Sequence, residues 1–181
     1  MDDRFGFVIL NYRTMDETMD CVKSIDEHIR EAHEIVIVDN ASPDGSGEKL
    51  RQVYDGRDDI KVIINADNLG YSCGNNAGIK QARLDGCRYV VVLNSDTKVM
   101  QDEFCDIVRQ EYRANGYAVI GPQIYKHGIP CCDNPGRDRA MSRFKLHIFI
   151  FMNRVFLALS YVALDAVLNR IFNAYVEAKK S

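Results

Sequence analysis

The stretch EIVIVDNASPDGSG, residues 34–47, places a strand-like apolar run directly before polar and turn-forming residues. The strand is expected to end at Asp39 and Asn40. The same pattern occurs three more times in the chain, as FVIL before Asn11, KVII before Asn65, and YVVVL before Asn94 and Asp96. In an open parallel sheet the carboxyl ends of the strands share one edge, where ligands bind. The pattern therefore predicts a ligand site built from these polar side chains.

The segments between the apolar runs have the spacing of amphipathic helices, and this alternation is typical of an α/β fold with a mostly parallel sheet between helices. Thr14 and Glu17 have the spacing of a capping box, which predicts a helix from there through Ile29. The expected strands cover residues 5–10, 34–38, 60–64 and 88–93, with a further strand in YAVIGPQIY, residues 117–125. The other expected helices are one with Leu50, Val53 and Tyr54 on its inner face, one that runs through residues 77 and 82 and stops at residue 86, and one over residues 102–115.

Composition limits the number of domains and the kind of partner. With 181 residues, 46% of them hydrophobic, the chain can bury one core and is too short for two full domains. Its net charge of -3 is small and no block of basic residues is present, so we expect a small ligand and not a nucleic acid. The 6 cysteines show no C-x-x-C spacing, and MDDRFG at the start is unlike a secretory signal. These features predict a reducing, cytoplasmic environment.

The pattern of the sequence changes after residue 125. We expect one α/β domain over residues 1–125, a loop over residues 126–140, and an apolar or amphipathic helical tail over residues 141–181. A membrane-spanning helix in the tail is disfavoured, because Arg154 and Asp165 would each cost about 2.5 to 3.5 kcal/mol at its centre. The tail is instead expected to pack on protein, including a partner or a second copy of the chain, or on a membrane surface.

The expected ligand site lacks the usual phosphate-binding turns. The turn after the first strand, NYRTMDET, matches neither G-x-G-x-x-G nor the phosphate-loop pattern. Asn94, Ser95 and Asp96 are candidates for holding Mg²⁺ or Mn²⁺, which proteins commonly share with substrate phosphates. Such an ion would supply the positive charge that a nucleotide diphosphate needs.

Asp39 is a candidate for reading a base, because a carboxylate there can accept a hydrogen bond from the N3–H of uracil or thymine. Asp39 and Asn40 can equally serve only to start a turn, as Asx residues often do. Similar alternatives hold for the segment NLGYSCGNNAGI, residues 68–79. Its glycines can serve backbone geometry alone, Asn75 and Asn76 can cap a helix, and Cys73 is expected to be a small packing residue.

Five segments together resemble one known family. They are ILNY, IVIVDNASPDGS, NLGYSCGNNAGI, YVVVLNSDT and GPQIY, in this order and spread over residues 5–125. The chain resembles the nucleotide-sugar glycosyltransferases of family 2, which have the GT-A fold, and in particular the rhamnosyltransferase-like bacterial members. The resemblance implies a Rossmann-like, nucleotide-binding GT-A half followed by the helical tail.

The resemblance also implies the activity and the roles of individual residues. The expected donor is a UDP- or dTDP-sugar, and the expected acceptor is a cell-surface polysaccharide, another glycan or a lipid-linked molecule. Asp96 is the expected metal ligand, together with Asn94, which replaces the first aspartate of the family's metal motif. The residues implied to bind the nucleotide are Leu10, Asn11, Tyr12, Asp39, Asn68, Gly70, Asn75, Asn94 and Ser95.

The acceptor-binding half of the family, which carries the general base, is not found in this sequence. Asp133, Asp138 and Asp165 are more simply explained as loop or helix-surface charges. The base of an inverting enzyme takes the proton of the acceptor hydroxyl, so the chain is expected to be a donor-binding half. The alternative is a non-catalytic nucleotide-binding or assembly module that docks a partner or a membrane. A receiver-like signalling domain is disfavoured, because Asn11 and Tyr12 stand where an acidic pair would be needed.

Overall fold

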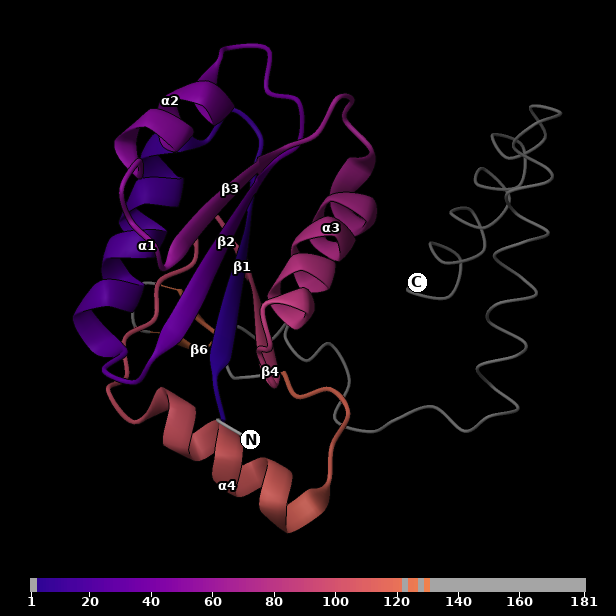
Figure 1. The fold of residues 1–181 in the computed structure, drawn as a ribbon. Helices are drawn as coiled ribbons and strands as arrows, with labels where there is room; N and C mark the ends of the chain where they lie inside the picture. Colours follow the sequence, from indigo (N-terminus) through magenta and orange to yellow (C-terminus); the bar gives the residue numbers. More distant parts are fainter. Residues whose placement is uncertain (1–2, 122–123, 127–128, 131–181) are drawn as a thin grey trace, which may run out of the picture. The chain divides into compact units, whose positions relative to one another are not determined.

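A computed structural model describes residues 3–121, 124–126 and 129–130 of the chain. Its main sheet has four parallel strands in the order β3-β2-β1-β4 (Figure 1). Asn11 is paired in register with Asp39, and Leu10 with Asn94. The predicted parallel α/β sheet is confirmed, and the residues after all four strands lie at one end, here called the carboxyl edge. The strands are β1 (Phe5–Asn11), β2 (His33–Asp39), β3 (Ile60–Ile64) and β4 (Tyr89–Asn94).

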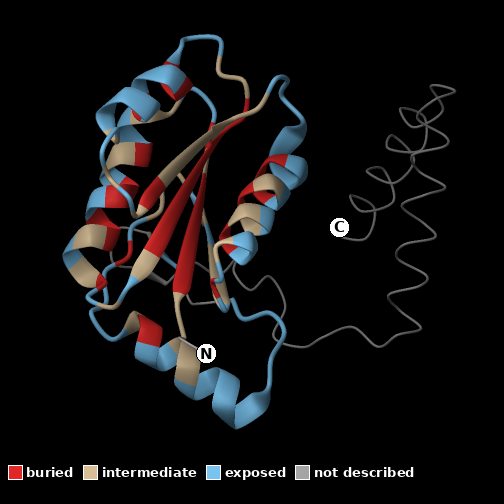
Figure 2. Cartoon of the chain, in the orientation of Figure 1, coloured by how far each residue is buried: buried red, intermediate tan, exposed pale blue. Residues whose placement is uncertain are grey.

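Helices cover both faces of this sheet, because the central strands carry apolar side chains on both sides. Phe5, Phe7 and Ile9 of β1 join a buried cluster with α1 (Met15–His28), α2 (Ser46–Val53) and α4 (Phe104–Asn115). Val8 belongs to a second cluster with α3 (Gly70–Leu84). Figure 1 shows α1 and α2 on the side of the sheet opposite α3, and Figure 2 shows β1 and β2 as the most buried elements. The core therefore consists of two layers separated by the sheet.

Two glycines let α3 lie close to the sheet. A Cβ atom at Gly74 would lie 2.5 Å from Leu10 Cδ1, and one at Gly78 would collide with Val8 Cγ1. Real Cβ atoms do not approach other side chains this closely, so a side chain at Gly78 would push against two valines of the sheet, and one at Gly74 would require the Leu10 side chain to move. This close approach holds the start of α3 against the carboxyl edge.

Several sequence-based boundaries change in the structure. The predicted capping box is wrong, since Thr14 is the N-cap of α1 but its side chain makes no capping hydrogen bond. Its hydroxyl lies 3.0 Å from Ser95 Oγ instead. The predicted strand over residues 117–125 is also wrong, because residues 117–121 form no ladder and β5 (Tyr125–Lys126) has two residues. β5 pairs antiparallel with β6 (Ile129–Pro130).

The chain divides into two compact units, residues 1–118 and 119–181. The four-stranded sheet and its helices belong to the first unit, and β5 and β6 belong to the second. The predicted loop after residue 130 and the predicted helical tail lie outside the described residues. Among the helices that the structure describes, none has the length and apolar character needed to cross a membrane.

Candidate functional site

Asn11, at the end of β1, is fully buried at the carboxyl edge and connects several loops. Its Nδ2 donates to Asp39 Oδ1 at 2.6 Å and to Ser46 Oγ at 2.9 Å. Its Oδ1 accepts a hydrogen bond from Thr18 Oγ1 at 3.1 Å. Buried polar groups are stable only when such partners are present, so Asn11 fixes β2, α1 and α2 relative to β1.

Asp39 faces the same buried network. It is 1% exposed, and its Oδ1 accepts a hydrogen bond from Ser42 Oγ at 2.6 Å while its Oδ2 accepts one from the Ser42 N–H at 2.9 Å. A Cβ atom at Gly47 would lie 2.6 Å from Asp39 Cγ, so α2 begins directly against the carboxylate. Asp39 thus organises the turn before α2. Its contact with a pyrimidine base stays a prediction.

Asn40 organises the loop that follows β3. The side chain is 2% exposed, and its Nδ2 donates to Asn68 Oδ1 at 2.7 Å. Its Oδ1 accepts hydrogen bonds from Asn65 Nδ2 at 3.1 Å and from the Leu69 N–H at 3.2 Å. Asn68 Oδ1 also accepts the N–H of Gly70, whose φ of +78° favours glycine. The polar residues that follow β2 and β3 are therefore joined through the side-chain amide of Asn40, which the sequence placed among the strand-end residues of the expected site.

Tyr71 connects the start of α3 with the end of β4. Its hydroxyl donates to Asn94 Oδ1 at 2.8 Å, and its ring is well exposed. Asn75 lies one turn further along α3, buried, with Nδ2 donating to the Tyr71 carbonyl at 3.0 Å. Asn75 Oδ1 is buried and has no partner among the described residues. Sequence reasoning did not select Tyr71, and the only available signal was an aromatic residue inside a loop rich in Asn and Gly.

Ser95 and Asp96 follow β4. Ser95 Oγ accepts the Thr14 hydroxyl hydrogen bond, and the Thr14 N–H donates to Asn11 Oδ1 at 3.3 Å. The hydrogen-bond network thus runs from Asp39 through Asn11 to the loop after β4. Asp96 is exposed, and within the described chain its carboxylate has no hydrogen-bond or ion-pair partner.

The residues after β4 fit a Mg²⁺ or Mn²⁺ ion by their chemistry. Asp96 offers a free carboxylate and Asn94 an exposed amide oxygen, both hard oxygen ligands. No set of three or more Asp, Glu, His or Cys ligands occurs at this edge within the described residues. Mg²⁺ is usually bound by one or two carboxylates plus phosphates and water, which this pair of residues would allow.

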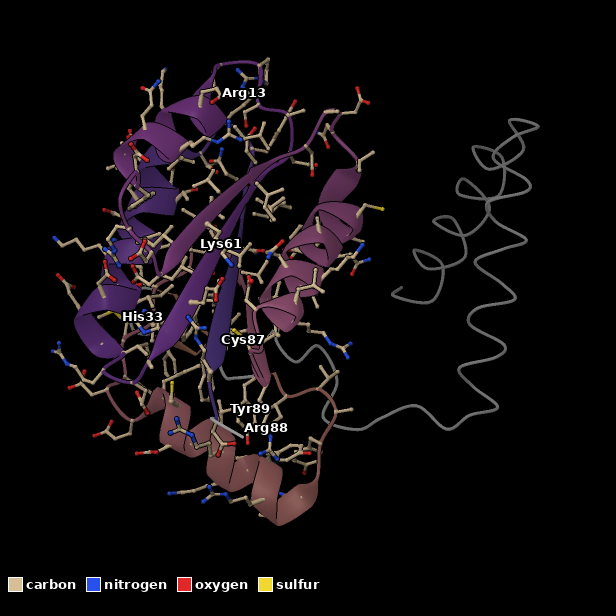
Figure 3. The ribbon with its side chains drawn as sticks, in the orientation of Figure 1. Arg13, His33, Lys61, Cys87, Arg88 and Tyr89 are labelled. Carbon is tan, nitrogen blue, oxygen red and sulfur yellow. The ribbon has the colours of Figure 1, made fainter. Side chains whose placement is uncertain are left out.

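A cluster of titratable residues elsewhere in the fold does not fit a metal as well. Asp26, His33 and Asp59 lie within 4.8 Å of one another, and β2 begins at His33 and β3 directly after Asp59, so they are at the amino ends of the strands. Arg57 already pairs with both carboxylates, through contacts of 3.0 Å to Asp26 and 2.6 Å to Asp59. These pairs tie α1 to the start of β3. Figure 3 shows His33 and Arg13 at different ends of the sheet.

The predicted nucleotide-binding residues all lie at the carboxyl edge but differ in exposure. Asn11, Asp39 and Asn75 are buried, and Leu10 and Ser95 are half-buried. The exposed ones are Tyr12, Asn68, Gly70 and Asn94. The structure therefore separates residues that build the edge from residues whose side chains a ligand can reach. The residues of the network that sequence reasoning missed are Ser42, Ser46, Thr18 and Tyr71.

A parallel sheet with polar side chains gathered at its carboxyl edge defines the class of open α/β proteins whose ligands bind at that edge. The model of the family described as Glycosyl transferase family 2 matches residues 7–166. The chain therefore belongs to glycosyl transferase family 2. The resemblance seen in the sequence is confirmed at this level, and the rhamnosyltransferase-like subgroup stays a prediction.

Curated relatives come from an archaeon and a bacterium. The chain is 31% identical over 145 residues to the low-salt glycan biosynthesis hexosyltransferase Agl10 of Haloferax volcanii, covering 79% of this chain and 44% of that protein. It is 32% identical over 96 residues to the poly-beta-1,6-N-acetyl-D-glucosamine synthase of Staphylococcus aureus, covering 53% of this chain and 22% of that protein. The chain thus spans less than half the length of these relatives.

Solved structures share the fold. The structure of S. aureus TarS 1–349 has a TM-score of 0.51 and 19% identity, covering 62% of this chain and 33% of that chain. The same protein in complex with UDP-GlcNAc has a TM-score of 0.51 and 18% identity, covering 67% of this chain and 40% of that chain. At this identity the likeness shows a common fold.

Proposed function

We propose that this chain is the nucleotide-sugar-binding half of a family 2 glycosyltransferase that takes its sugar from a UDP- or dTDP-sugar. The observation that carries the proposal is the family match over residues 7–166, which includes all four polar stops at the carboxyl edge. The Agl10 relative is a hexosyltransferase of glycan biosynthesis, and TarS, which shares the fold, binds UDP-GlcNAc. Both support a nucleotide-sugar donor and a glycan acceptor.

Different residues would contact the nucleoside and the diphosphate of the donor. Tyr12 and Asn68 are exposed on the loops after β1 and β3 and can contact the nucleoside, while the buried Asn11 and Asp39 keep those loops in place. Asp96 and Asn94 would hold the Mg²⁺ or Mn²⁺ ion. A divalent ion there supplies positive charge to a departing diphosphate.

The acceptor, the stereochemistry and the location belong to the same proposal. We assign an inverting transfer to a cell-surface polysaccharide or a lipid-linked glycan, in which a carboxylate of the acceptor-binding half takes the proton of the acceptor hydroxyl. The donor would be bound in the cytoplasm. The segment over residues 141–181 would pack on a partner, a second copy of the chain or the inner membrane surface.

Calorimetry of the whole chain with UDP and dTDP, with and without Mn²⁺, tests the donor assignment. We expect Mn²⁺-dependent binding that Asp96→Ala weakens at least about tenfold, as loss of metal-site residues commonly does. Asp58→Ala is the matched control, since Asp58 is exposed just before β3, at the opposite end of the sheet. Binding that is equally tight without Mn²⁺ and in the Asp96 variant would contradict the metal site.

A transfer assay separates the enzyme from the non-catalytic alternative. UDP-sugars are incubated with the chain and Mn²⁺, with and without an added glycan acceptor, and the release of UDP by transfer or by hydrolysis is followed over time. Release that Asp96→Ala abolishes supports a transferase. Mn²⁺-dependent binding without any release favours the nucleotide-binding module.

A further inference from the structure

Arg13 lies between β1 and α1 at the carboxyl edge, where Figure 3 labels it. Its backbone has a φ of 62°, in the left-handed region that side chains other than glycine rarely adopt. The Arg13 N–H donates to Ser42 Oγ at 3.0 Å, and the Ser42 hydroxyl in turn bonds to Asp39. The buried network therefore holds an arginine in a conformation that is easier for glycine, and such outliers often mark functional positions.

The charge of Arg13 is not neutralised within the described part of the chain. Its side chain is exposed and makes no ion pair or hydrogen bond with a described residue. The loops that follow the four strands, residues 12–14, 40–45, 65–69 and 95–103, contain one other basic residue, Lys98. Lys98 is paired with Asp20 at 2.7 Å. Arg13 is thus the unpaired cation of these loops.

The acidic groups near Arg13 leave its charge available. Hydrogen bonds from Ser46 are the main reason that the pKa of Asp44 is lowered, and the charge of Arg13 is the smallest contribution. No ion pair or hydrogen bond joins the Arg13 and Asp44 side chains. Asp16 and Glu17 occupy the first turn of α1, so that helix start offers an anion little net positive charge.

We propose that Arg13 binds the diphosphate of the nucleotide donor, an inference that rests on the proposed function. A diphosphate needs positive charge, and the turn that carries Arg13 has no glycine-rich phosphate loop. A guanidinium donates two parallel hydrogen bonds to a phosphate and stays charged at any physiological pH. Arg13 would bind the diphosphate together with the ion held at Asp96.

The test compares ligands with and without phosphate. UDP and uridine are titrated into the whole chain with Mn²⁺ present, for wild type and Arg13→Gln. We expect the variant to bind UDP about tenfold or more weakly, as for loss of a hydrogen bond to a charged group, and to bind uridine as wild type does. Arg13→Lys keeps the positive charge but lacks the paired donors of a guanidinium. Its affinity for UDP is expected to lie between those of wild type and Arg13→Gln.

Two further variants control for folding and for charge. Arg13→Gly relieves the left-handed backbone, so it is expected to fold at least as stably as wild type and still lose UDP affinity. Arg83→Gln is the matched control, because Arg83 is exposed on α3 without a described partner, and its UDP affinity is expected to stay unchanged.

The possible outcomes distinguish this inference from the proposed function. If wild type binds UDP with Asp96 dependence but Arg13→Gln binds UDP equally well, the Arg13 assignment is wrong and the proposed function stands. An equal loss of affinity for UDP and for uridine in Arg13→Gln would also overturn the assignment, because Arg13 would then shape the nucleoside site. If wild type binds neither ligand, both proposals are wrong.

Discussion

The polar residues at the strand ends have two different physical roles. Asn11 and Asp39 are buried and use their hydrogen-bonding atoms on protein partners, whereas Asn94, the last residue of β4, and Asp96, just beyond it, are exposed. Burial of the first pair is stable because each polar atom finds a partner. Substitutions in the buried pair should therefore act mainly on folding, and substitutions in the exposed pair mainly on ligand binding.

Asn11→Ala is expected to lower the free energy of unfolding by about 3 kcal/mol, because buried partners lose their hydrogen bonds. Urea denaturation followed by far-UV circular dichroism measures the change. Asn115→Ala is the control, since Asn115 is exposed at the end of α4, and it should stay within about 0.5 kcal/mol of wild type. An equally small effect of Asn11→Ala would show that the buried network contributes little to stability.

At the scale of elements, the fit of α3 against β1 and β2 depends on atoms that are missing from its glycines. Gly74 lies over Leu10, and Gly78 lies over Val8 and Val38. A methyl group added at Gly78 would press on these two valines and move the helix away from the sheet. Because Tyr71 on the same helix contacts Asn94, such a shift would also disturb the carboxyl edge.

Gly78→Ala is expected to destabilise the fold by about 1 to 3 kcal/mol through overpacking, even though alanine favours helix by about 1 kcal/mol. The midpoint of urea denaturation is the measurement. Ser72→Ala, on an exposed position of the same helix, is expected to be neutral or slightly stabilising. A stabilised Gly78→Ala protein would mean that α3 does not pack as closely as described.

A partly buried charge cluster links β2, β3 and the end of α3. Lys61 Nζ lies 2.9 Å from Glu34 Oε1 and 2.5 Å from Asp85 Oδ1. Burial raises the pKa of Glu34, and the neighbouring Asp85 carboxylate raises it further. Burial also acts to raise the pKa of Asp85, but hydrogen bonds from Glu34 and Lys61 outweigh it and bring that pKa to about 2. Asp85 is therefore ionised in the folded state at neutral pH.

A carboxyl group whose pKa is lower in the folded state than in the unfolded state stabilises the fold at any pH above its unfolded-state pKa. This contribution is lost as the pH falls through the folded-state pKa. Asp85→Asn should therefore cost about 1 kcal/mol at pH 7, after discounting for solvent screening. The difference from wild type should shrink as the pH falls from about 4 toward about 2. Urea denaturation of wild type and Asp85→Asn across this pH range measures the difference, and Asp58→Asn, at an exposed position, is the control. A difference independent of pH would rule out the ionised Asp85 as its cause.

At the scale of the whole molecule, the parallel sheet and the position of its polar edge could be predicted from the sequence. Apolar runs with polar stops define strand ends, and the helices between them require parallel neighbours. The capping box at Thr14 and the strand over residues 117–125 could not be predicted correctly. In the first case the Thr14 hydroxyl donates its hydrogen bond to a tertiary partner, Ser95. In the second case no strand among the described residues pairs with residues 117–121.

The sequence by itself determined where the carboxyl edge lies and which polar residues end the strands there, because strand periodicity and polar stops are local properties of the chain. Only the tertiary structure decided which of their side chains are buried and which remain exposed to a ligand. Asn11 and Ser46 are 35 residues apart, and Thr14 and Ser95 are 81 residues apart. A side chain turns toward the partner that satisfies its hydrogen bonds, and that partner is known only when the segments have packed together.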